Sequence, residues 1–244
     1  MSENQRDPAT DTRRMKAILV LVATLAFVSS PLWSRGFGGF NPDDFPVPLN
    51  DPAIQPAGYV FAIWGLIYLW LLLSAGFGLF ARAEDAEWDR TRWWLAASLA
   101  VGAPWISVAN ASPVWATVLI VGMLVPAAIA LRVSPAADPW LLRAPVALYA
   151  GWLSVATAVA FGVLLTGYGA PFWAWVVLPV AVLAAARFQT GLARAPLYGL
   201  AVAWGLGGIV AGNLAAGRLA LAAFAALLVL LVIAAAVLSA RRSV

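Results

Sequence analysis

The sequence predicts an all-α protein, a polytopic membrane helix bundle of about eight transmembrane helices, and three observations lead to this prediction. Of the 244 residues, 63% are hydrophobic and 11% are charged, and the mean hydropathy is +0.88, whereas soluble domains carry about 25% charged residues. The apolar residues form long runs that are separated by short connections rich in Pro, Gly, Asp and Arg. The basic residues flank these runs. A water-soluble core could not cover so much apolar side chain, so the remaining surface must face lipid.

Each predicted helix is an apolar run close to the length of about 20 residues that a spanning helix needs. The eight runs are 15–33, 57–81, 93–110, 113–131, 141–166, 171–186, 195–215 and 219–240. Residues 1–14 form a polar N-terminal tail before the first run. The breaks at 110–113 and 167–171 contain almost no charged residue and depend on Asn, Ser, Gly and Pro as breakers.

The distribution of basic residues tests this number of spans. With eight spans and a cytoplasmic N-terminus, 13 of the 15 basic residues fall inside and two, Arg35 and Arg218, fall outside. Merging the two spans around Asn110 would place Arg132 and Arg143 outside and destroy this bias. The charges therefore predict a multi-pass inner-membrane protein with cytoplasmic N- and C-termini. They also account for the net charge of +4 without a nucleic-acid partner.

The first run has a second interpretation, because Arg13 and Arg14 precede it as they would in a secretory or twin-arginine signal. Cleavage would then fall near Ser30 or Ser34. Seven further spans favour a basic flank that fixes the first helix instead.

The composition also excludes several functions. The chain has no Cys and no His, which removes disulfides, thiolate catalysis and the usual metal ligands and general base. No Asp, Glu, Lys or Arg lies deep in a predicted span, which argues against ion-coupled pumps and charge-lined channels. The acidic residues gather in two loops and are expected to be solvated or paired with arginines; they are Asp43, Asp44 and Asp51, and Glu84, Asp85, Glu87 and Asp89. We therefore predict no catalytic residues, no enzyme activity and no metal site.

Thirteen tryptophans are the most unusual feature of the composition. Those near predicted span ends are typical of the aromatic belt at the lipid headgroups; they are Trp33, Trp88, Trp93, Trp140 and Trp173. Four others, Trp64, Trp105, Trp152 and Trp204, lie several residues from any charged flank. Trp64 and Tyr68 share one helix face with Phe61. Such a stripe is typical of helix packing, and the pattern alone favours packing, but it would equally suit the wall of a flat apolar pocket.

Two pairs of small or weakly polar residues have a predicted role. Gly208 and Gly212 form a small-xxx-small pair that allows close helix approach and would permit a homodimer. Asn110 and Asn213 lie near the predicted outer ends of their spans, where they would cap helices or line the mouth of a cavity.

Residues 55–68 contain a proline entry at Pro56 and a Trp-x-x-x-Tyr pair at Trp64 and Tyr68. This segment resembles the second helix of the tryptophan-rich sensory protein family (TspO/MBR, translocator protein). Residues 102–105 are similar to its third helix, and residues 148–157 are similar to its fifth, with Tyr149 and Trp152 as the Tyr-x-x-Trp pair. The resemblance covers residues 15–166, the family's five-helix core, and residues 167–244 add three helices and a short basic tail, as in the longer bacterial variety. The chain departs from the pattern where it has Gln55-Pro56 for a double proline and alanines at 156, 158 and 160 for polar residues.

The resemblance implies a receptor or carrier in a bacterial inner membrane that binds a tetrapyrrole, a sterol or another flat hydrophobic molecule between its helices, with a sensing or transport role. We predict that segment 34–56 covers the outer mouth of the pocket, and that the ligand-binding residues are Pro56, Tyr59, Phe61, Trp64, Tyr68, Trp105, Asn110, Tyr149 and Trp152. No cofactor is required. A tetrapyrrole would bind without a covalent link and without axial iron ligation, because His and Cys are absent and Met occurs only at 1, 15 and 123. The predicted partners are the lipid bilayer and a hydrophobic small molecule.

Two other classes stay open at this stage. A small-solute or lipid transporter would be indicated by repeated halves, but the aromatic motif at 55–68 has no counterpart in the second half. The chain could instead be a structural subunit of a larger membrane complex. Degradation of porphyrins in light is suggested by family analogy alone.

Overall fold

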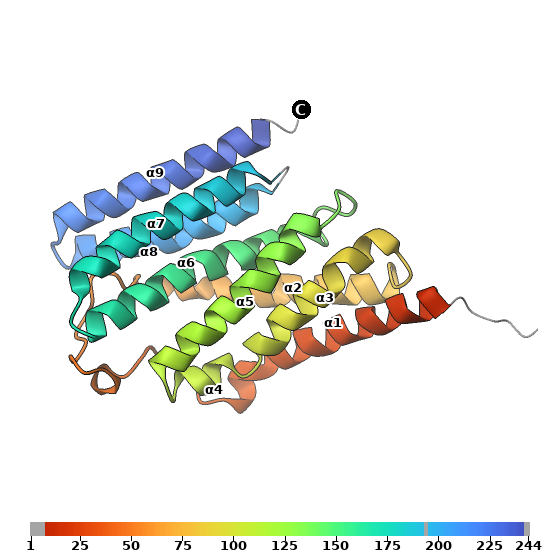
Figure 1. Ribbon diagram of the computed structural model, residues 1–244, viewed down its shortest axis with the longest axis horizontal. Coiled ribbons are helices and arrows are strands. Elements are labelled where there is room, and N and C mark those ends of the chain that lie inside the picture. Colours follow the sequence, from red (N-terminus) through yellow and green to blue (C-terminus); the bar gives the residue numbers. More distant parts are fainter. Residues whose placement is uncertain (1–7, 193–194, 242–244) are drawn as a thin grey trace, which may run out of the picture.

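The computed structural model describes residues 8–192 and 195–241, and within these ranges every regular element is a helix (Figure 1). The α-helices are α1 (Pro8–Trp33), α2 (Ile63–Phe80), α3 (Ala86–Gly102), α4 (Trp105–Ala109), α5 (Pro113–Val133), α6 (Arg143–Gly167), α7 (Pro171–Thr190), α8 (Pro196–Ala215) and α9 (Leu219–Arg241). Two short 3₁₀ helices, η1 (Pro42–Asp44) and η2 (Gly58–Ala62), lie between α1 and α2. The predicted all-α membrane bundle is confirmed.

Seven helices within the described residues are long and apolar enough to cross a membrane, namely α1, α2 together with η2, and α5 to α9. The third predicted span, 93–110, differs from the structure. Helix α3 begins at Ala86, because the carboxylate of Asp85 accepts hydrogen bonds from the backbone N–H groups of Glu87 and Trp88 and so caps the helix. Helix α3 ends at Gly102, just before Pro104, which lacks an N–H and disrupts a continuous helix. Helices α3 and α4 together run beside α1 and α5 as the eighth segment of the bundle (Figure 1).

The two breaks with little charge are confirmed. Helix α5 begins with Pro113, and the Ser112 side chain accepts a hydrogen bond from the Trp115 N–H, an ordinary N-cap. Helix α6 ends at Gly167, and α7 begins with Pro171 after a turn in which Gly169 has a φ of +81°. Proline in the first helical turn costs nothing, because that N–H has no partner within the helix.

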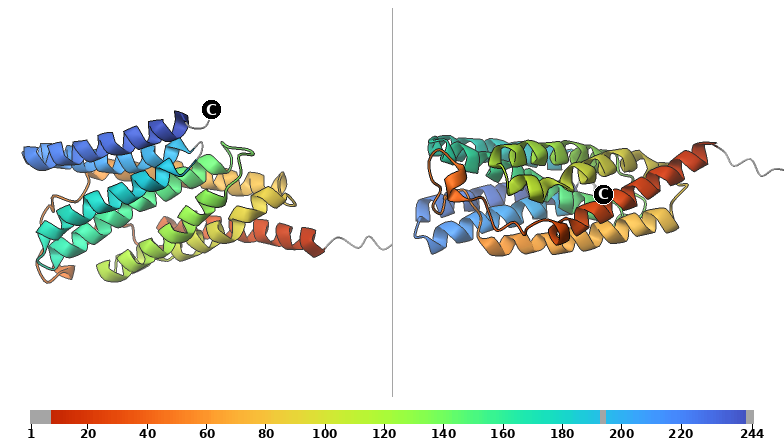
Figure 2. Two further views of the ribbon diagram at one scale, coloured as in Figure 1. Left: turned by 45° about the horizontal axis from the view of Figure 1, so that its top comes forward. Right: turned by 90° about the horizontal axis from the view of Figure 1, so that it is seen from below.

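Helix α6 is the centre of the bundle. It packs against α5 on one side and against α7 and α8 on the other. In its most apolar stretch of 18 residues, 67% of the residues are buried. Helices α1, α3, α4 and α5 lie on one side of it and α7 to α9 on the other (Figures 1 and 2), and α2 passes behind it in the view of Figure 1. A Cβ at Gly151 would overlap the backbone carbonyl of Tyr198, so α6 and α8 cross in direct backbone contact at this glycine.

The two ends of the bundle carry different charges. The described chain ends and the turns α2–α3, α5–α6 and α7–α8 lie at one end, and segment 34–56 lies at the other (Figure 1). All described basic residues except Arg35 and Arg218 belong to the first end. This separation agrees with the charge bias in the sequence, whereas the cytoplasmic location of the basic end stays a prediction.

Arg92 organises the basic end. It is 3% exposed, and its guanidinium donates to the backbone carbonyls of Arg13, Ala83 and Arg82 at 2.8, 2.8 and 2.5 Å. Asp89 accepts from Lys16 at 2.7 Å and lies 3.4 Å from Arg92. Arg92 and Asp89, in the first turns of α3, therefore hold α1 and the turn between α2 and α3 together.

Four of the five tryptophans expected at the membrane interface are more than half exposed; these are Trp33, Trp93, Trp140 and Trp173. The expectation for Trp88 is wrong, because this side chain is only 3% exposed. Its indole N–H donates to the Asp138 carboxylate at 3.0 Å, and its ring lies against Gly78, where a Cβ would approach the ring to 2.8 Å. Trp88 therefore belongs to the first turn of α3 and packs inside the bundle.

Candidate functional site: an aromatic cavity between the helices

A cavity of about 550 Å³ lies between α1, α2, α5 and α6 and extends to the end of the bundle where segment 34–56 runs. Its volume is within the range of about 300–1,000 Å³ that is typical of small-molecule sites. Aromatic, aliphatic and glycine residues form most of the lining. The cavity could therefore bind an apolar molecule of drug-like or larger size.

The aromatic face of α2 forms one wall. Trp64 and Tyr68 stack with ring centroids 5.4 Å apart, and both line the cavity. Phe27 of α1 meets Trp64 and Tyr68 edge to face at 5.8 and 5.2 Å. Trp152 of α6 is approached edge-on by Trp64 at 6.0 Å and by Phe61 at 5.9 Å. The aromatic stripe at Phe61, Trp64 and Tyr68 thus both packs with its neighbours and borders an open space.

Helix α4 and segment 34–56 form the outer part of the lining. The Trp105 indole N–H donates to the Ala116 carbonyl of α5 at 3.0 Å, which fixes the orientation of the ring. Phe37 meets Trp105 and Phe40 edge to face, each at 5.2 Å. Gly39, which also lines the cavity, has a φ of +109°, a conformation that side chains rarely adopt. Segment 34–56 therefore borders the mouth of the cavity, as expected.

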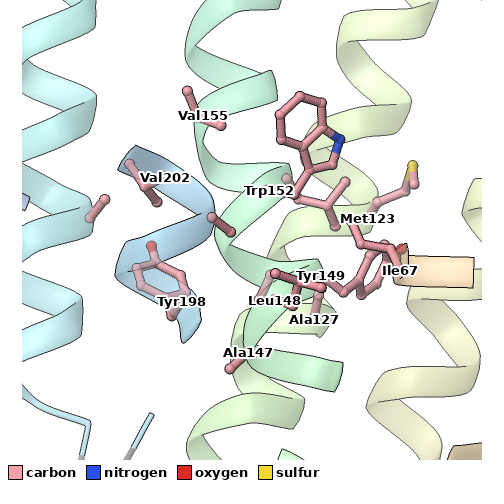
Figure 3. Close-up of a cluster of buried hydrophobic side chains, with 14 of the residues drawn as sticks. Ile67, Met123, Ala127, Ala147, Leu148, Tyr149, Trp152, Val155, Tyr198 and Val202 are labelled. Atoms are coloured by element: carbon pink, nitrogen blue, oxygen red, sulfur yellow. The ribbon is translucent and has the colours of Figure 1, made fainter. Parts of the chain in front are cut away.

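Behind the cavity wall lies a polar contact that fixes α6 against α3 and α5. The Tyr149 hydroxyl lies 2.9 Å from the Ser98 hydroxyl, which donates to the Met123 carbonyl at 2.7 Å. Figure 3 shows Tyr149 and Trp152 on the same side of α6 as Met123 and Ile67, with Tyr198 of α8 on the other side. Tyr149 is fully buried, whereas Trp152 and Met123 reach the cavity.

The structure brings most of the predicted binding residues together. Six of the nine line the cavity: Pro56, Phe61, Trp64, Tyr68, Trp105 and Trp152. Three lie elsewhere. Tyr59 is 56% exposed and packs edge-on against Trp204, and Asn110 donates to the Arg35 carbonyl at 2.7 Å. Tyr149 is buried and contacts Phe27, with ring centroids 5.8 Å apart. A ligand-binding role for any of these residues stays a prediction.

Sequence reasoning missed several lining residues, including Phe27, Phe37, Phe40, Met123 and Val159. The sequence does contain a signal for Phe37 and Phe40, because two phenylalanines flank a pair of glycines in a segment already expected at the mouth. Phe27 gave no signal, since α1 is apolar on most of its faces and its neighbours cannot be read from one sequence.

Helix α8, one of the three helices beyond the expected core, also takes part in the site. Gly205 lines the cavity, and the segment 51–60, which we call the strap, lies against α8. The Ala57 N–H donates to the Gly208 carbonyl at 2.9 Å, and the Trp204 indole N–H donates to the Val60 carbonyl at 2.9 Å. The strap supplies Pro56 to the lining, so α8 positions part of the cavity wall.

The outer end of the strap is held in the same way. The Asn213 side chain donates to the Ala53 carbonyl at 2.7 Å, and Arg218 pairs with the Asp51 carboxylate at 2.7 Å. Asp51 has a φ of +48°, in the left-handed region that Asp adopts more often than most residues with a Cβ. The two asparagines expected at a cavity mouth, Asn110 and Asn213, therefore both bind the backbone of the loop between α1 and α2.

The glycine pair on α8 allows close approach within the chain. A Cβ at Gly208 would lie 2.5 Å from Val60 Cγ1 and 2.9 Å from Pro56 Cβ, and a Cβ at Gly212 would lie 3.5 Å from the Gln55 carbonyl oxygen. The strap occupies this surface, so the pair serves intramolecular packing. A homodimer stays a prediction that must depend on another surface.

Fold and site together define a polytopic helical membrane protein with an aromatic cavity bordered by its own helices and by the loop between α1 and α2. A family model described as TSPO-like protein matches residues 17–238, nearly the whole chain. The chain belongs to this TSPO-like family, which confirms the resemblance seen in the motifs. The match continues through α7, α8 and most of α9. No curated protein and no solved structure matches the chain significantly.

Proposed function

We propose that the protein is an integral membrane receptor or carrier that binds a flat hydrophobic ligand, tetrapyrrole-like or sterol-like, in the cavity between α1, α2, α5 and α6. The observation that supports this most directly is the 550 Å³ cavity itself, because three indole rings and the Tyr68 ring border one space. Planar rings offer broad apolar faces and lose little conformational entropy when a flat ligand stacks on them. Membership of the TSPO-like family supports the same function.

The loop between α1 and α2 is the part of the molecule that we propose responds to ligand binding. Segment 34–56 and the overlapping strap together form one loop that borders the mouth. Asn110 attaches this loop to the end of α4, and Asn213 attaches it to α8. In this proposal a ligand that enters past Phe37 and Phe40 shifts this loop. Sensing or transport would then follow from the movement of one cover segment relative to rigid helices.

A titration of the purified full-length protein tests the binding proposal. The probes are protoporphyrin IX, its dimethyl ester and a sterol, followed by quenching of tryptophan fluorescence and by the absorbance of the bound porphyrin. We expect the Trp64→Ala, Trp105→Ala double variant to weaken binding by about tenfold or more, because two ring contacts of about 0.5–1.5 kcal/mol each and their buried area are lost. A Trp115→Ala, Trp173→Ala double variant is the matched control, since these rings are 62% and 57% exposed and do not line the cavity. Equal affinity in both double variants would refute the pocket assignment.

We further propose that the basic end faces the cytoplasm of a bacterial inner membrane. The cysteine-free chain allows single cysteines to be placed at either end. A membrane-impermeant maleimide should label Asn50→Cys in intact spheroplasts and Ala136→Cys only after lysis, because both residues are exposed and lie at opposite ends. The reverse pattern would invert the orientation.

A further inference from the structure

The lining of the cavity is uncharged. Among the described residues that border it there is no Asp, Glu, Lys or Arg, and the polar side chains are Ser30, Gln55, Tyr68 and the three indoles. An ionised carboxylate placed in such a site loses its hydration and finds no cation to pair with, at an effective cost of several kcal/mol. A neutral molecule avoids this cost.

The mouth adds a second barrier to anions. Asp43 and Asp44, in η1, follow the lining residue Phe40 by three and four residues and are exposed. Neither forms an ion pair with another described residue. The basic residues at this end are Arg35, which is exposed, and Arg218, which is already paired with Asp51 at 2.7 Å. Around segment 34–56 the charged groups without an ion-pair partner are therefore two carboxylates and one guanidinium. Their net negative charge repels an approaching anion.

The cations that could compensate a carboxylate are at the other end of the bundle. Arg82, Arg92 and Lys16 lie at the basic end, where they already bind Asp138, Asp89 and backbone carbonyls. A ligand seated in the cavity with its acidic groups toward the mouth cannot reach them.

From these observations we propose that the site selects electrically neutral ligands, taking sterols and the esters of tetrapyrrole carboxylic acids in preference to ionised tetrapyrrole dicarboxylates. This proposal rests on the proposed function, because it concerns the ligand class of the same cavity. It assigns a specificity role to Asp43 and Asp44 and to the lack of any cation in the wall.

The test compares two probes with the same ring system, protoporphyrin IX and its dimethyl ester, on the full-length protein in nanodiscs of phosphatidylcholine at pH 8. The ester should bind at least about tenfold more tightly, because even 1.4 kcal/mol of the desolvation cost corresponds to that factor. An Asp43→Asn, Asp44→Asn double variant should bind the diacid several-fold more tightly and the ester unchanged. Both substitutions preserve the hydrogen bonds that form η1, because the Asp43 N–H donates to the Asn41 side-chain oxygen and the Asp44 N–H to the Asn41 carbonyl, and neither carboxylate takes part.

A cavity-filling variant separates binding in the cavity from partition into lipid. Ala156 lines the cavity, so Ala156→Trp should abolish the binding of the probes in the cavity. Ala223→Trp, on the exposed side of α9, should leave this binding intact. If the diacid binds as tightly as the ester or more tightly, and Ala156→Trp removes both, the cavity is a binding site but the preference for neutral ligands is refuted. If Ala156→Trp and Ala223→Trp behave alike for every probe, the proposed function fails, and the preference fails with it.

Discussion

Replacement of Gly208 by alanine should separate the role of α8 in the cavity from its role as a membrane helix. A Cβ at this position would lie 2.5 Å from Val60 Cγ1 and 2.9 Å from Pro56 Cβ, whereas carbon atoms in contact are normally about 3.5–4.0 Å apart. The strap would have to move away from α8 by about 1 Å. Overpacking of this kind costs about 1–3 kcal/mol, and weakening of the hydrogen bond from Ala57 to the Gly208 carbonyl adds about 0.5–1.5 kcal/mol. The gain in helix propensity from Gly to Ala offsets about 1 kcal/mol.

The net expectation for Gly208→Ala is a loss of about 0.5–3.5 kcal/mol of stability, together with a weaker ligand affinity because Pro56 and Phe61 leave their positions in the wall. Thermal unfolding in detergent and the dimethyl ester titration measure the two effects. Gly207→Ala is a closely matched control, because it is the neighbouring residue of the same helix and its Cβ would have nothing within 4 Å. That variant should keep its affinity and melt at the same temperature or slightly above. Equal behaviour of the two variants would refute the close contact between strap and helix.

Three further predictions concern groups outside the cavity wall. The hydrogen bond from Arg82 holds the pKa of Asp138 below its usual range. The resulting stability is present above the unfolded pKa of about 4 and is lost as the pH falls through the folded pKa. Between pH 6 and pH 3 the melting temperature should therefore fall more for the wild type than for Asp138→Asn. Arg92→Lys should lower the melting temperature by several degrees, because an ammonium cannot reproduce the fork of bonds to three carbonyls, whereas Arg90→Lys, at an exposed position, should not. Tyr149→Phe should cost about 0.5–1.5 kcal/mol of stability through the lost hydroxyl contact but leave ligand affinity unchanged, and a large loss of affinity would return this residue to the binding site.

The membrane class and most of the helix ends could be predicted from the sequence, because each depends on neighbouring residues. Pro113 and Pro171 mark helix starts that need no tertiary information, since the missing N–H suits the first turn. The start of α3 could not be predicted in this way. Residues 86–92 are too polar for an apolar run, yet they are helical because Asp85 caps them and Lys16 of α1 pairs with Asp89. That stabilisation comes from a helix about 70 residues earlier in the chain.

The same distinction applies to the site. Trp64 and Tyr68 could be placed on one helix face by their spacing of four, and the Trp-x-x-x-Tyr motif pointed to a pocket. The family resemblance also put Tyr59 and Tyr149 among the candidates, although the structure leaves the first exposed and buries the second beside Phe27. A single sequence gives the face of a helix but not its rotation relative to its neighbours, so it cannot decide which aromatic residues border a space.

The three helices that follow residue 166 are best understood from the hydrogen bonds that α8 makes. Four contacts join α8 and its C-terminal turn to the strap, and they involve both backbone and side-chain groups. Without α8 the Ala57 N–H and the Ala53 carbonyl of the strap would lose these hydrogen-bond partners, and a buried backbone group left unsatisfied costs about 1–3 kcal/mol. Helices α7 and α9 in turn pack against α8 and fix its position. The additional helices therefore support one side of the cavity through the strap, which explains why residues 51–60 depend on a glycine and an asparagine more than 140 residues later.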